Sequence, residues 1–179
     1  MENVEEKLKK IKIIVSDVDG VLTDGKLYLL GQEEEIKVFF SKDEPRVVIA
    51  LKSGLRVLLV TARKCKAVVR RAEEMKVELM YKDELKEKKF LDVIKEKYGL
   101  EAGEIAYIGD DWSDLYLMEQ VGVAITPYDG SNENKKVAHI ITEAKGGGGV
   151  MAEAIEKIMK AQGTWETCLR ESVLEIYQD

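Results

Sequence analysis

The sequence has few of the residues on which several common kinds of site depend. It contains one histidine, His139, and two cysteines, Cys65 and Cys168, which form no Cys-x-x-Cys pair. A metal site with two histidines is therefore excluded, and a Ser-His-Asp triad would have a single candidate base. The separated cysteines favour a reducing compartment over a disulfide framework or a zinc site. His139 stands beside two isoleucines, so we expect a structural role for it.

Charge and hydropathy exclude further classes of protein. Lys and Arg number 28 against 34 Asp and Glu, which gives a net charge of −6 without a basic block. Nucleic acid and anionic membranes are therefore poor partners. No apolar run approaches the ~18 residues of a membrane span, and the start of the chain does not resemble a signal peptide, so we expect a cytoplasmic protein. With 179 residues and 45% apolar content, the chain suits one domain with a substantial core.

Short apolar runs alternate with amphipathic segments along the chain. The runs predict buried strands at residues 11–15, 56–60, 77–81, 104–108, 123–125 and 139–141, and the segments predict helices at 45–54, 64–76, 86–98, 113–120 and 149–160. Two more strands, at 27–30 and 36–40, predict a β-hairpin after the first strand. Strands separated by helices predict an α/β fold with a parallel sheet and right-handed crossovers.

The pattern changes after Gly163. Trp165, Leu169 and Val173 recur at i, i+4 and i+8, which predicts one apolar stripe on a terminal helix. Two interpretations stay open: the helix packs on its own domain, or it docks on a neighbouring subunit. We therefore divide the chain into a domain at 1–163 and a tail at 164–179.

Acidic and polar side chains stand where three of the predicted strands end. Asp17 and Asp19 follow the first strand, Thr61 the second and Asp110 the third. Because the carboxyl ends of parallel strands share one edge of a sheet, where ligands bind, we expect Asp17, Asp19 and Asp110 to meet there, with Thr61 at the same edge. Carboxylates repel one another in a low dielectric, so either one is protonated or a cation lies between them. Hard oxygen ligands favour Mg²⁺, which a substrate phosphate can also bind.

Plainer explanations exist for the two aspartates after the first strand. An EF-hand loop that began at Asp17 would need an oxygen ligand and a glycine where Val21 and Leu22 stand, so that pattern fails. Asp17 and Asp19 as turn residues after a strand remain an alternative.

Structural explanations also compete further along the chain. Asp111 or Ser113 is suited to cap the helix that follows. The glycines at 146–149 precede no Gly-Lys-Ser/Thr, so they favour a flexible turn, with backbone contact to a ligand as the second interpretation.

The run Asp-Val-Asp-Gly-Val-Leu-Thr-Asp-Gly at 17–25 resembles the first motif of the haloacid dehalogenase superfamily of phosphatases. It is most similar to a small capless subgroup that acts on phosphorylated sugar acids. The hairpin segment at 34–39, Thr-Ala-Arg at 61–63, Gly-Asp-Asp at 109–111, Asp114, the glycine run and Ala-Gln-Gly at 161–163 extend the likeness over about residues 11–163. The resemblance implies a Rossmann-like parallel sheet with helices on both faces, a hairpin insertion and no large cap domain.

The resemblance also implies an Mg²⁺-dependent phosphatase reaction. Asp17 would be the nucleophile that forms an aspartyl-phosphate, and Asp19 would protonate the leaving sugar oxygen and then activate water. Mg²⁺ would be bound by Asp17, the backbone carbonyl of Asp19, and Asp110.

Other residues would support this centre. Thr61 and a lysine would hold the phosphate oxygens, and Asp111 and Asp114 would orient water and the lysine. In an ungapped alignment with the family motif, a glutamate stands at the position of the phosphate lysine. A shift of one residue moves this position to Lys86, with Lys88 as the second choice.

Recognition of the sugar acid would involve four residues. Arg63 and Arg71 match positions that contact the sugar acid, and Lys42 and Asp43 belong to the substrate loop. This loop departs from the family pattern, because it has Glu44 and Pro45 where permissive residues are usual.

The favoured substrate is 3-deoxy-D-manno-octulosonate 8-phosphate, which would connect the protein with lipopolysaccharide biosynthesis. N-acylneuraminate 9-phosphate or another small phosphorylated metabolite is the alternative. A non-catalytic tetrameric binding domain is the alternative of another class. The resemblance implies a homotetramer in which neighbouring subunits help to close the active site.

Overall fold

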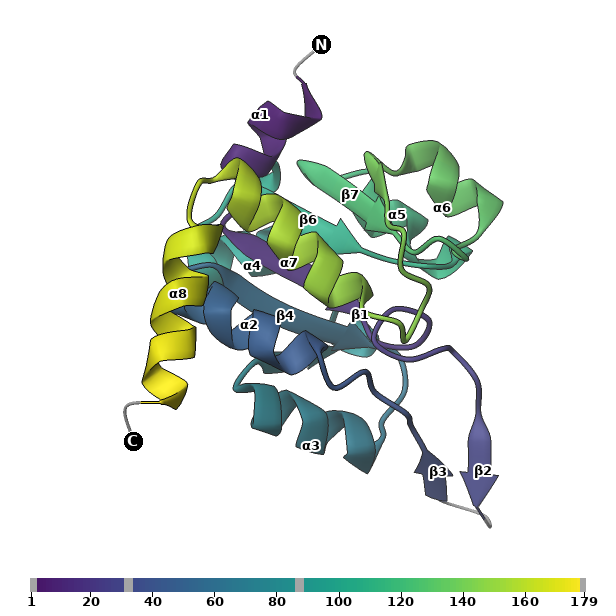
Figure 1. Ribbon diagram of the computed structural model, residues 1–179. Helices are drawn as coiled ribbons and strands as arrows, with labels where there is room; N and C mark the ends of the chain where they lie inside the picture. Colours follow the sequence, from purple (N-terminus) through teal and green to yellow (C-terminus); the bar gives the residue numbers. More distant parts are fainter. Residues whose placement is uncertain (1–2, 31–33, 86–88, 178–179) are drawn as a thin grey trace.

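The structure is a computed structural model that describes residues 3–30, 34–85 and 89–177. Six parallel strands form its central sheet in the order β5-β4-β1-β6-β7-β8 (Figure 1). The strands are β1 (Ile13–Asp17), β4 (Arg56–Thr61), β5 (Glu78–Tyr81), β6 (Ile105–Ile108), β7 (Val123–Thr126) and β8 (Ile140–Ile141). The predicted α/β parallel sheet is confirmed, and each predicted strand is present with small shifts of its ends.

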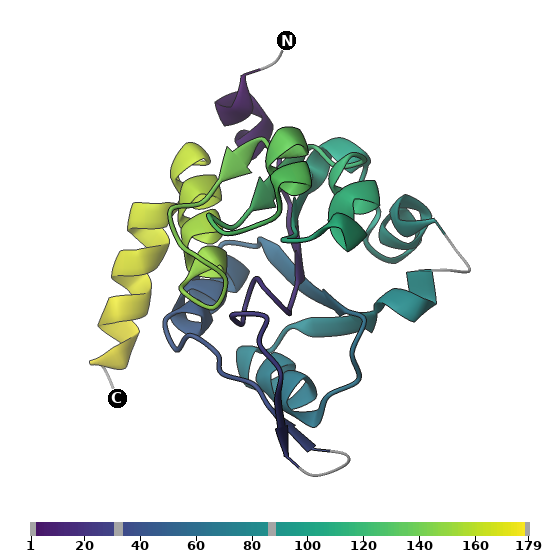
Figure 2. The same cartoon turned by 90° about the vertical axis from the view of Figure 1, so that its right-hand side faces the viewer.

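Helices cover both faces of the sheet, because successive side chains of each buried strand point to opposite sides. Ile14 belongs to the core on one face, whereas Ile13 and Val15 belong to the core on the other. The first face is covered by α1 (Val4–Lys9), α2 (Asp43–Lys52), α3 (Lys66–Met75) and α7 (Val150–Ala161), and the second by α4 (Phe90–Tyr98) and α5 (Leu115–Met118). Figure 2 shows the sheet between these two layers.

The helices differ from the sequence predictions in several places. The helix predicted at 86–98 begins at Phe90, because Lys89 has extended backbone angles; residues 86–88 lie outside the described ranges. The helix predicted at 113–120 is divided into a 3₁₀ turn, η3 (Trp112–Asp114), and α5. Further short elements that the sequence analysis did not predict are α1, α6 (Asn132–Val137), η1 (Lys82–Leu85) and η2 (Ala102–Glu104).

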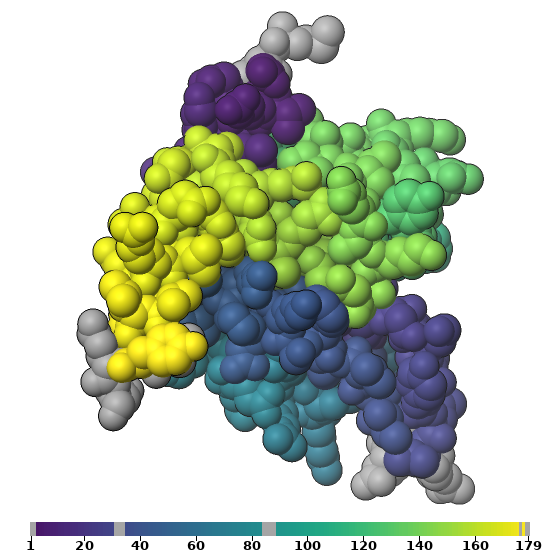
Figure 3. All heavy atoms as spheres, viewed as in Figure 1, coloured from purple at the N-terminus to yellow at the C-terminus, as the bar shows by residue number. Residues whose placement is uncertain are grey.

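The β-hairpin extends from the body of the protein. It consists of β2 (Tyr28–Leu30) and β3 (Glu34–Ile36), which pair with each other as a separate antiparallel sheet. The predicted insertion is confirmed, although its second strand starts earlier than the predicted 36–40. Leu27, Leu29, Leu30 and Val38 are exposed on it, and Leu29 is 67% exposed. The hairpin, which projects from the body of the protein (Figures 1 and 3), therefore presents apolar side chains outside the core.

The tail forms helix α8 (Trp165–Ile176), which packs beside α2 and α7 (Figure 3). Trp165 is buried in the core and Leu169 packs against it, whereas Val173 and Leu174 are exposed. The first part of the predicted stripe thus packs on its own domain. Contact of the remaining part with a neighbouring subunit stays a prediction.

His139 has a structural position, as predicted. Its Nδ1 accepts a hydrogen bond from the Ala124 backbone N–H at 3.0 Å, and its Nε2 lies 2.7 Å from Lys7 Nζ. It therefore connects α1 with the sheet.

Over the part of the chain that the structure describes, every helix is too short or too polar to cross a bilayer.

Candidate active site

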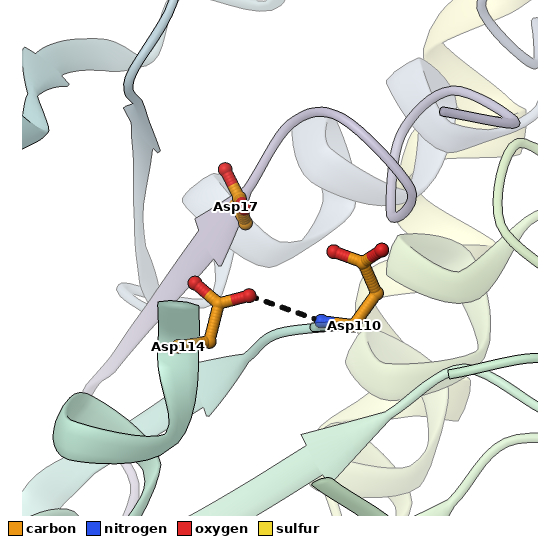
Figure 4. A group of neighbouring side chains, drawn as sticks. All are labelled: Asp17, Asp110 and Asp114. Atoms are coloured by element: carbon orange, nitrogen blue, oxygen red, sulfur yellow. Dashed lines mark hydrogen bonds between the residues drawn. The ribbon is translucent and has the colours of Figure 1, made fainter. Parts of the chain in front are cut away.

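Three carboxylates converge at the carboxyl edge of the sheet. Asp17 ends β1, Asp110 follows β6, and Asp114 ends η3. One carboxylate oxygen of each lies within 4.8 Å of the others, and Figure 4 shows the three side chains around a common point. Asp17 and Asp110 meet as predicted, but the Asp19 side chain, which was predicted to join them, is not part of this group, and Asp114 supplies its third side chain.

The crowding of these carboxylates changes their acidity. Burial raises the pKa of Asp17 to about 7, and the charge of Asp114 adds to the rise. Burial likewise raises the pKa of Asp110 to about 7, with contributions from Asp17 and Asp114. The negative charge at this edge is therefore incompletely compensated by the chain itself, which is the condition that favours a bound cation.

Asp114 is held by hydrogen bonds on both of its oxygens. Its Oδ1 accepts from Lys82 Nζ at 2.8 Å and from the Tyr107 hydroxyl at 2.9 Å. Its Oδ2 accepts from the backbone N–H groups of Asp110 at 3.2 Å and Asp111 at 3.4 Å. Asp111 also begins η3 as its N-cap, as one of the structural explanations predicts. This arrangement suits Asp114 to orient its neighbours.

Among the residues that the structure describes, Lys82 lies at the carboxylates of Asp17 and Asp114. Its Nζ donates to Asp17 Oδ2 at 3.0 Å and to Asp114 Oδ1 at 2.8 Å. Burial opposes its charge, but the two carboxylates outweigh this effect and raise the pKa of Lys82. The sequence analysis placed the phosphate lysine at Lys86 or Lys88, and both lie outside the described residues.

The sequence itself contains a signal for the place of Lys82. Lys82 directly follows β5, so it stands at the same sheet edge as Asp17 and Asp110. A polar residue directly after a parallel strand lies at this edge, so the position of Lys82 in the sequence predicts its place beside the two aspartates.

Glycines allow the loop after β1 to approach its neighbours. A Cβ atom on Gly20, whose φ is +89°, would lie 2.0 Å from Asp110 Oδ2. A Cβ atom on Gly146 would lie 2.2 Å from the backbone oxygen of Gly20, and Gly147 N–H donates to the Val21 carbonyl at 3.0 Å. The glycine run therefore packs on the loop that follows Asp17, which neither sequence interpretation anticipated.

Asp19 and Thr61 stand at the same edge outside the carboxylate group. The Asp19 side chain pairs with Lys37 Nζ, and the Thr23 hydroxyl lies 3.5 Å from its Oδ1. Thr61 ends β4, is fully buried, and accepts from the Arg63 backbone N–H at 3.2 Å. The catalytic roles of both residues stay predictions.

Arg63 and Arg71, predicted to contact substrate, both have partners within the chain. Arg63 pairs with Glu35 at 2.7 Å. Arg71 is 10% exposed and donates to Glu44 at 2.6 Å, while its Nη2 is buried without a hydrogen-bond partner. Contact of either arginine with substrate therefore stays a prediction.

The two residues of the substrate loop differ in exposure. Asp43 is 1% exposed and accepts from the Ala152 N–H at 2.9 Å in the first turn of α7, so it has a structural position. Burial raises the pKa of Asp43 to about 6. Lys42 is exposed, with Nζ 5.8 Å from the centre of the Phe40 ring. Substrate contacts of Lys42 and Asp43 stay predictions.

Comparison with known proteins decides the family. A family model described as haloacid dehalogenase-like hydrolase matches residues 69–155. The 3-deoxy-D-manno-octulosonate 8-phosphate phosphatase KdsC of Escherichia coli is 30% identical over 171 residues, which cover 96% of this chain and 91% of the relative. The chain belongs to the haloacid dehalogenase-like hydrolases. The resemblance that the sequence motifs carry is thereby confirmed.

Solved structures of 3-deoxy-D-manno-octulosonate 8-phosphate phosphatases have a fold similar to that of this haloacid dehalogenase-like hydrolase. A 3-deoxy-D-manno-octulosonate 8-phosphate phosphatase from Moraxella catarrhalis, solved with a magnesium ion, a phosphate ion and a KDO molecule, is 31% identical with a TM-score of 0.87, covering 94% of this chain and 97% of that chain. The enzyme of that name from Yersinia pestis is 30% identical with a TM-score of 0.85, covering 91% and 88%.

Proposed function

We propose that the protein is an Mg²⁺-dependent phosphomonoester hydrolase that releases phosphate from a phosphorylated sugar acid. The observation that carries this proposal is the setting of Asp17, a buried carboxylate at the end of a central strand, held by Lys82 and grouped with Asp110. The favoured substrate is 3-deoxy-D-manno-octulosonate 8-phosphate, because the relatives from E. coli and Moraxella catarrhalis are named for it.

Mg²⁺ fits the residues of this site. Asp17 and Asp110 supply hard oxygen atoms, and because burial raises the pKa of each to about 7, a bound cation would favour their ionised forms. We assign the cation to Asp17, Asp110 and the backbone carbonyl of Asp19, while the oxygens of Asp114 are engaged by hydrogen bonds. When bound, Mg²⁺ would neutralise charge on the phosphate and thereby allow an anionic nucleophile to approach it.

Asp17 performs the first chemical step in this proposal. A carboxylate oxygen attacks phosphorus, the bond between phosphorus and the sugar oxygen breaks, and an aspartyl-phosphate forms. Lys82 fixes the carboxylate through Oδ2 and favours its ionised form. Thr61, at the end of the adjacent strand β4, holds a phosphate oxygen.

Asp19 moves the protons of the reaction. It donates a proton to the leaving sugar oxygen and then accepts one from the water that attacks the aspartyl-phosphate. That second step releases phosphate and regenerates Asp17. The Asp19 side chain is 23% exposed, so it is open to a bound substrate, unlike the buried Asp114.

The contact between Glu44 and Arg71 supports a second class of substrate. Glu44, in the first turn of α2 where the resemblance places the substrate loop, accepts a hydrogen bond from one nitrogen of Arg71, which the resemblance assigns to the sugar acid. N-acylneuraminate 9-phosphate or another small phosphorylated metabolite is therefore the second candidate. A non-catalytic binding domain is disfavoured, because Asp17, Asp19 and Asp110 are all present.

We further propose that the protein forms a homotetramer and is located in the reducing cytoplasm. The apolar hairpin is suited to pack against hairpins of neighbouring subunits, because isolated two-stranded sheets are marginally stable. Both cysteines are free thiols, which suits a reducing compartment. Light scattering tests the assembly, and a monomer at micromolar concentration would contradict it.

The experiment that tests the function measures phosphate release with Mg²⁺ from 3-deoxy-D-manno-octulosonate 8-phosphate, N-acylneuraminate 9-phosphate and glucose 6-phosphate. Asp17→Asn is the blank. We expect a preference for the first substrate and no release above the blank when Mg²⁺ is removed. Equal, slow turnover of all three would contradict the assigned substrate, and release equal to the blank would contradict the reaction.

A further inference from the structure

A buried lysine on the hairpin contacts the predicted general acid. Lys37, one residue after β3, pairs through Nζ with Asp19 Oδ1 and lies 3.2 Å from Glu35 Oε1. Its side chain is 2% exposed, so it has almost no access to solvent. A buried ammonium group is costly unless carboxylates compensate its charge. Asp19 and Glu35 supply this compensation together.

Glu35 extends these contacts to a predicted substrate residue. Its Oε2 accepts from Arg63 Nη2 at 2.7 Å. The Arg63 guanidinium is the main reason that the pKa of Glu35 is lowered to about 2, with a further contribution from Lys37. Glu35 therefore stays ionised at neutral pH, and its charge helps to compensate that of Lys37. Four side chains, Asp19, Lys37, Glu35 and Arg63, thus form one line of alternating charge.

The contacts on Asp19 are made to one oxygen. Lys37 Nζ and the Thr23 hydroxyl both lie at Oδ1, so Oδ2 is not needed to hold the side chain. Two contacts on one oxygen fix the rotation of a carboxyl group and decide which oxygen is presented to a ligand.

We propose that Lys37 is a positioning residue, which holds Asp19 by Oδ1 so that Oδ2 is presented to the leaving oxygen of the substrate. The inference rests on the proposed function, because it assigns a purpose to the general acid of that reaction. Lys37 acts through Asp19 and not on substrate in this proposal, because Asp19 and Glu35 engage its ammonium group.

The competing explanation is that Lys37 only anchors the hairpin. The two explanations differ in how the effect depends on the leaving group. A sugar alkoxide needs a proton as it leaves, whereas p-nitrophenolate leaves without one. Loss of a positioned general acid therefore slows cleavage of a sugar phosphate far more than cleavage of p-nitrophenyl phosphate. A merely structural role would slow both reactions alike.

The test compares Lys37→Met with Lys26→Met. Lys26 is its matched control, because it precedes the same hairpin but is exposed and pairs with Asp24 at 3.1 Å. Single-turnover rates are measured with 3-deoxy-D-manno-octulosonate 8-phosphate and with p-nitrophenyl phosphate. For Lys37→Met, we expect the rate with 3-deoxy-D-manno-octulosonate 8-phosphate to fall about 10- to 100-fold, because part of the usual contribution of general acid catalysis is lost. We expect KM to change by less than about 3-fold. The second rate should change by less than about 3-fold, and Lys26→Met should leave both rates unchanged.

An equal loss with both substrates, or no loss with either, would overturn the proposal. A crystal structure of Lys37→Met supplies a readout that does not depend on activity. We expect the Asp19 carboxyl group to leave its present rotamer while β3 stays in place. If the wild-type protein hydrolyses neither substrate, the proposed function fails. The crystal structure still decides the inference then, because Asp19 unmoved in the variant would show that Lys37 does not hold it.

Discussion

Lys82 Nζ lies 3.0 Å from Asp17 Oδ2 and thereby joins the first residue of η1 to the last residue of β1. The same nitrogen reaches Asp114, which in turn is bonded to the backbone of Asp110. The lysine charge therefore offsets part of the repulsion among three grouped carboxylates. One side chain thus serves both the folding of this edge and the orientation of the predicted nucleophile.

The first prediction separates Lys82 from the lysine expected from the sequence. Lys82→Ala should lower kcat for phosphate release at least about 100-fold, because it removes a charge from the predicted nucleophile and phosphate site. Lys86→Ala is the matched control and should keep at least about half of the wild-type kcat. Steady-state phosphate release measures both, and the reverse ranking would return the role to Lys86.

The second prediction concerns the approach of Gly20 to Asp110. Gly20→Ala would put a Cβ atom 2.0 Å from Asp110 Oδ2, so it should weaken Mg²⁺ binding by at least about 10-fold and reduce activity in parallel. Isothermal titration with Mg²⁺ measures the affinity.

Gly25→Ala is the control for backbone strain. Gly25 also has a positive φ, +72°, but a Cβ atom there would lie no closer than 3.5 Å to Gly20. The variant should lose about 1–2 kcal/mol of stability and keep its Mg²⁺ affinity. Equal Mg²⁺ affinity in the two variants would contradict the role given to Gly20.

The third prediction follows from the pKa of Asp17 and Asp110. Both pKa values are raised from 3.8 to about 7. Between these two pH values, the metal-free folded protein therefore keeps protons that the unfolded chain has released. The stability from these groups is therefore complete below about pH 4 and is lost as the pH rises through 7. Melting temperatures in EDTA should fall between pH 5.5 and pH 8, and Mg²⁺ should raise the value at pH 8 more than at pH 5.5. In Asp110→Asn, both the pH dependence of the melting temperature and that of the Mg²⁺ effect should be weaker. If the metal-free melting temperature of this variant depends on pH as strongly as that of the wild type, the assignment is refuted.

The fourth prediction concerns Glu44 and the specificity of Arg71. Glu44 places a carboxylate 2.6 Å from Arg71 Nη1, where a substrate carboxylate would compete with it. Glu44→Gln should lower KM for 3-deoxy-D-manno-octulosonate 8-phosphate about 3- to 10-fold and leave KM for glucose 6-phosphate unchanged. A parallel fall in both KM values would show that Arg71 does not recognise the sugar carboxylate. Glu74→Gln is the control, because Glu74 lies farther from Arg71 at 3.5 Å.

Strand ends were the most informative part of the sequence. Asp17 and Asp110 follow apolar runs, and parallel pairing of β1 with β6 brings such positions to one edge. The core dictates which segments are buried strands, and the topology then dictates where these strands end. Lys82 was missed because the lysine was sought by family register instead of by its place after β5.

Residues in loops and on helices were harder to interpret. Asp43 and Arg71 are both buried, and their partners, the Ala152 N–H and Glu44, come from segments whose packing no local pattern records. The pairing of Lys37 with Asp19 also joins residues that only the path of the hairpin brings together. The short helices α1 and α6 carry too few residues for helical periodicity to be visible.

The central claim is that Asp17 becomes phosphorylated, and mass spectrometry of an acid-quenched reaction tests it most directly. The Asp19→Asn variant is mixed with Mg²⁺ and p-nitrophenyl phosphate, which needs no acid to leave, and is quenched and digested. Without Asp19 to activate water, the intermediate should accumulate, so the account predicts one phosphoryl group on Asp17. The Asp17→Asn variant should carry none. Release of p-nitrophenol with Asp17 unmodified, or with the phosphoryl group on another residue, would contradict the account.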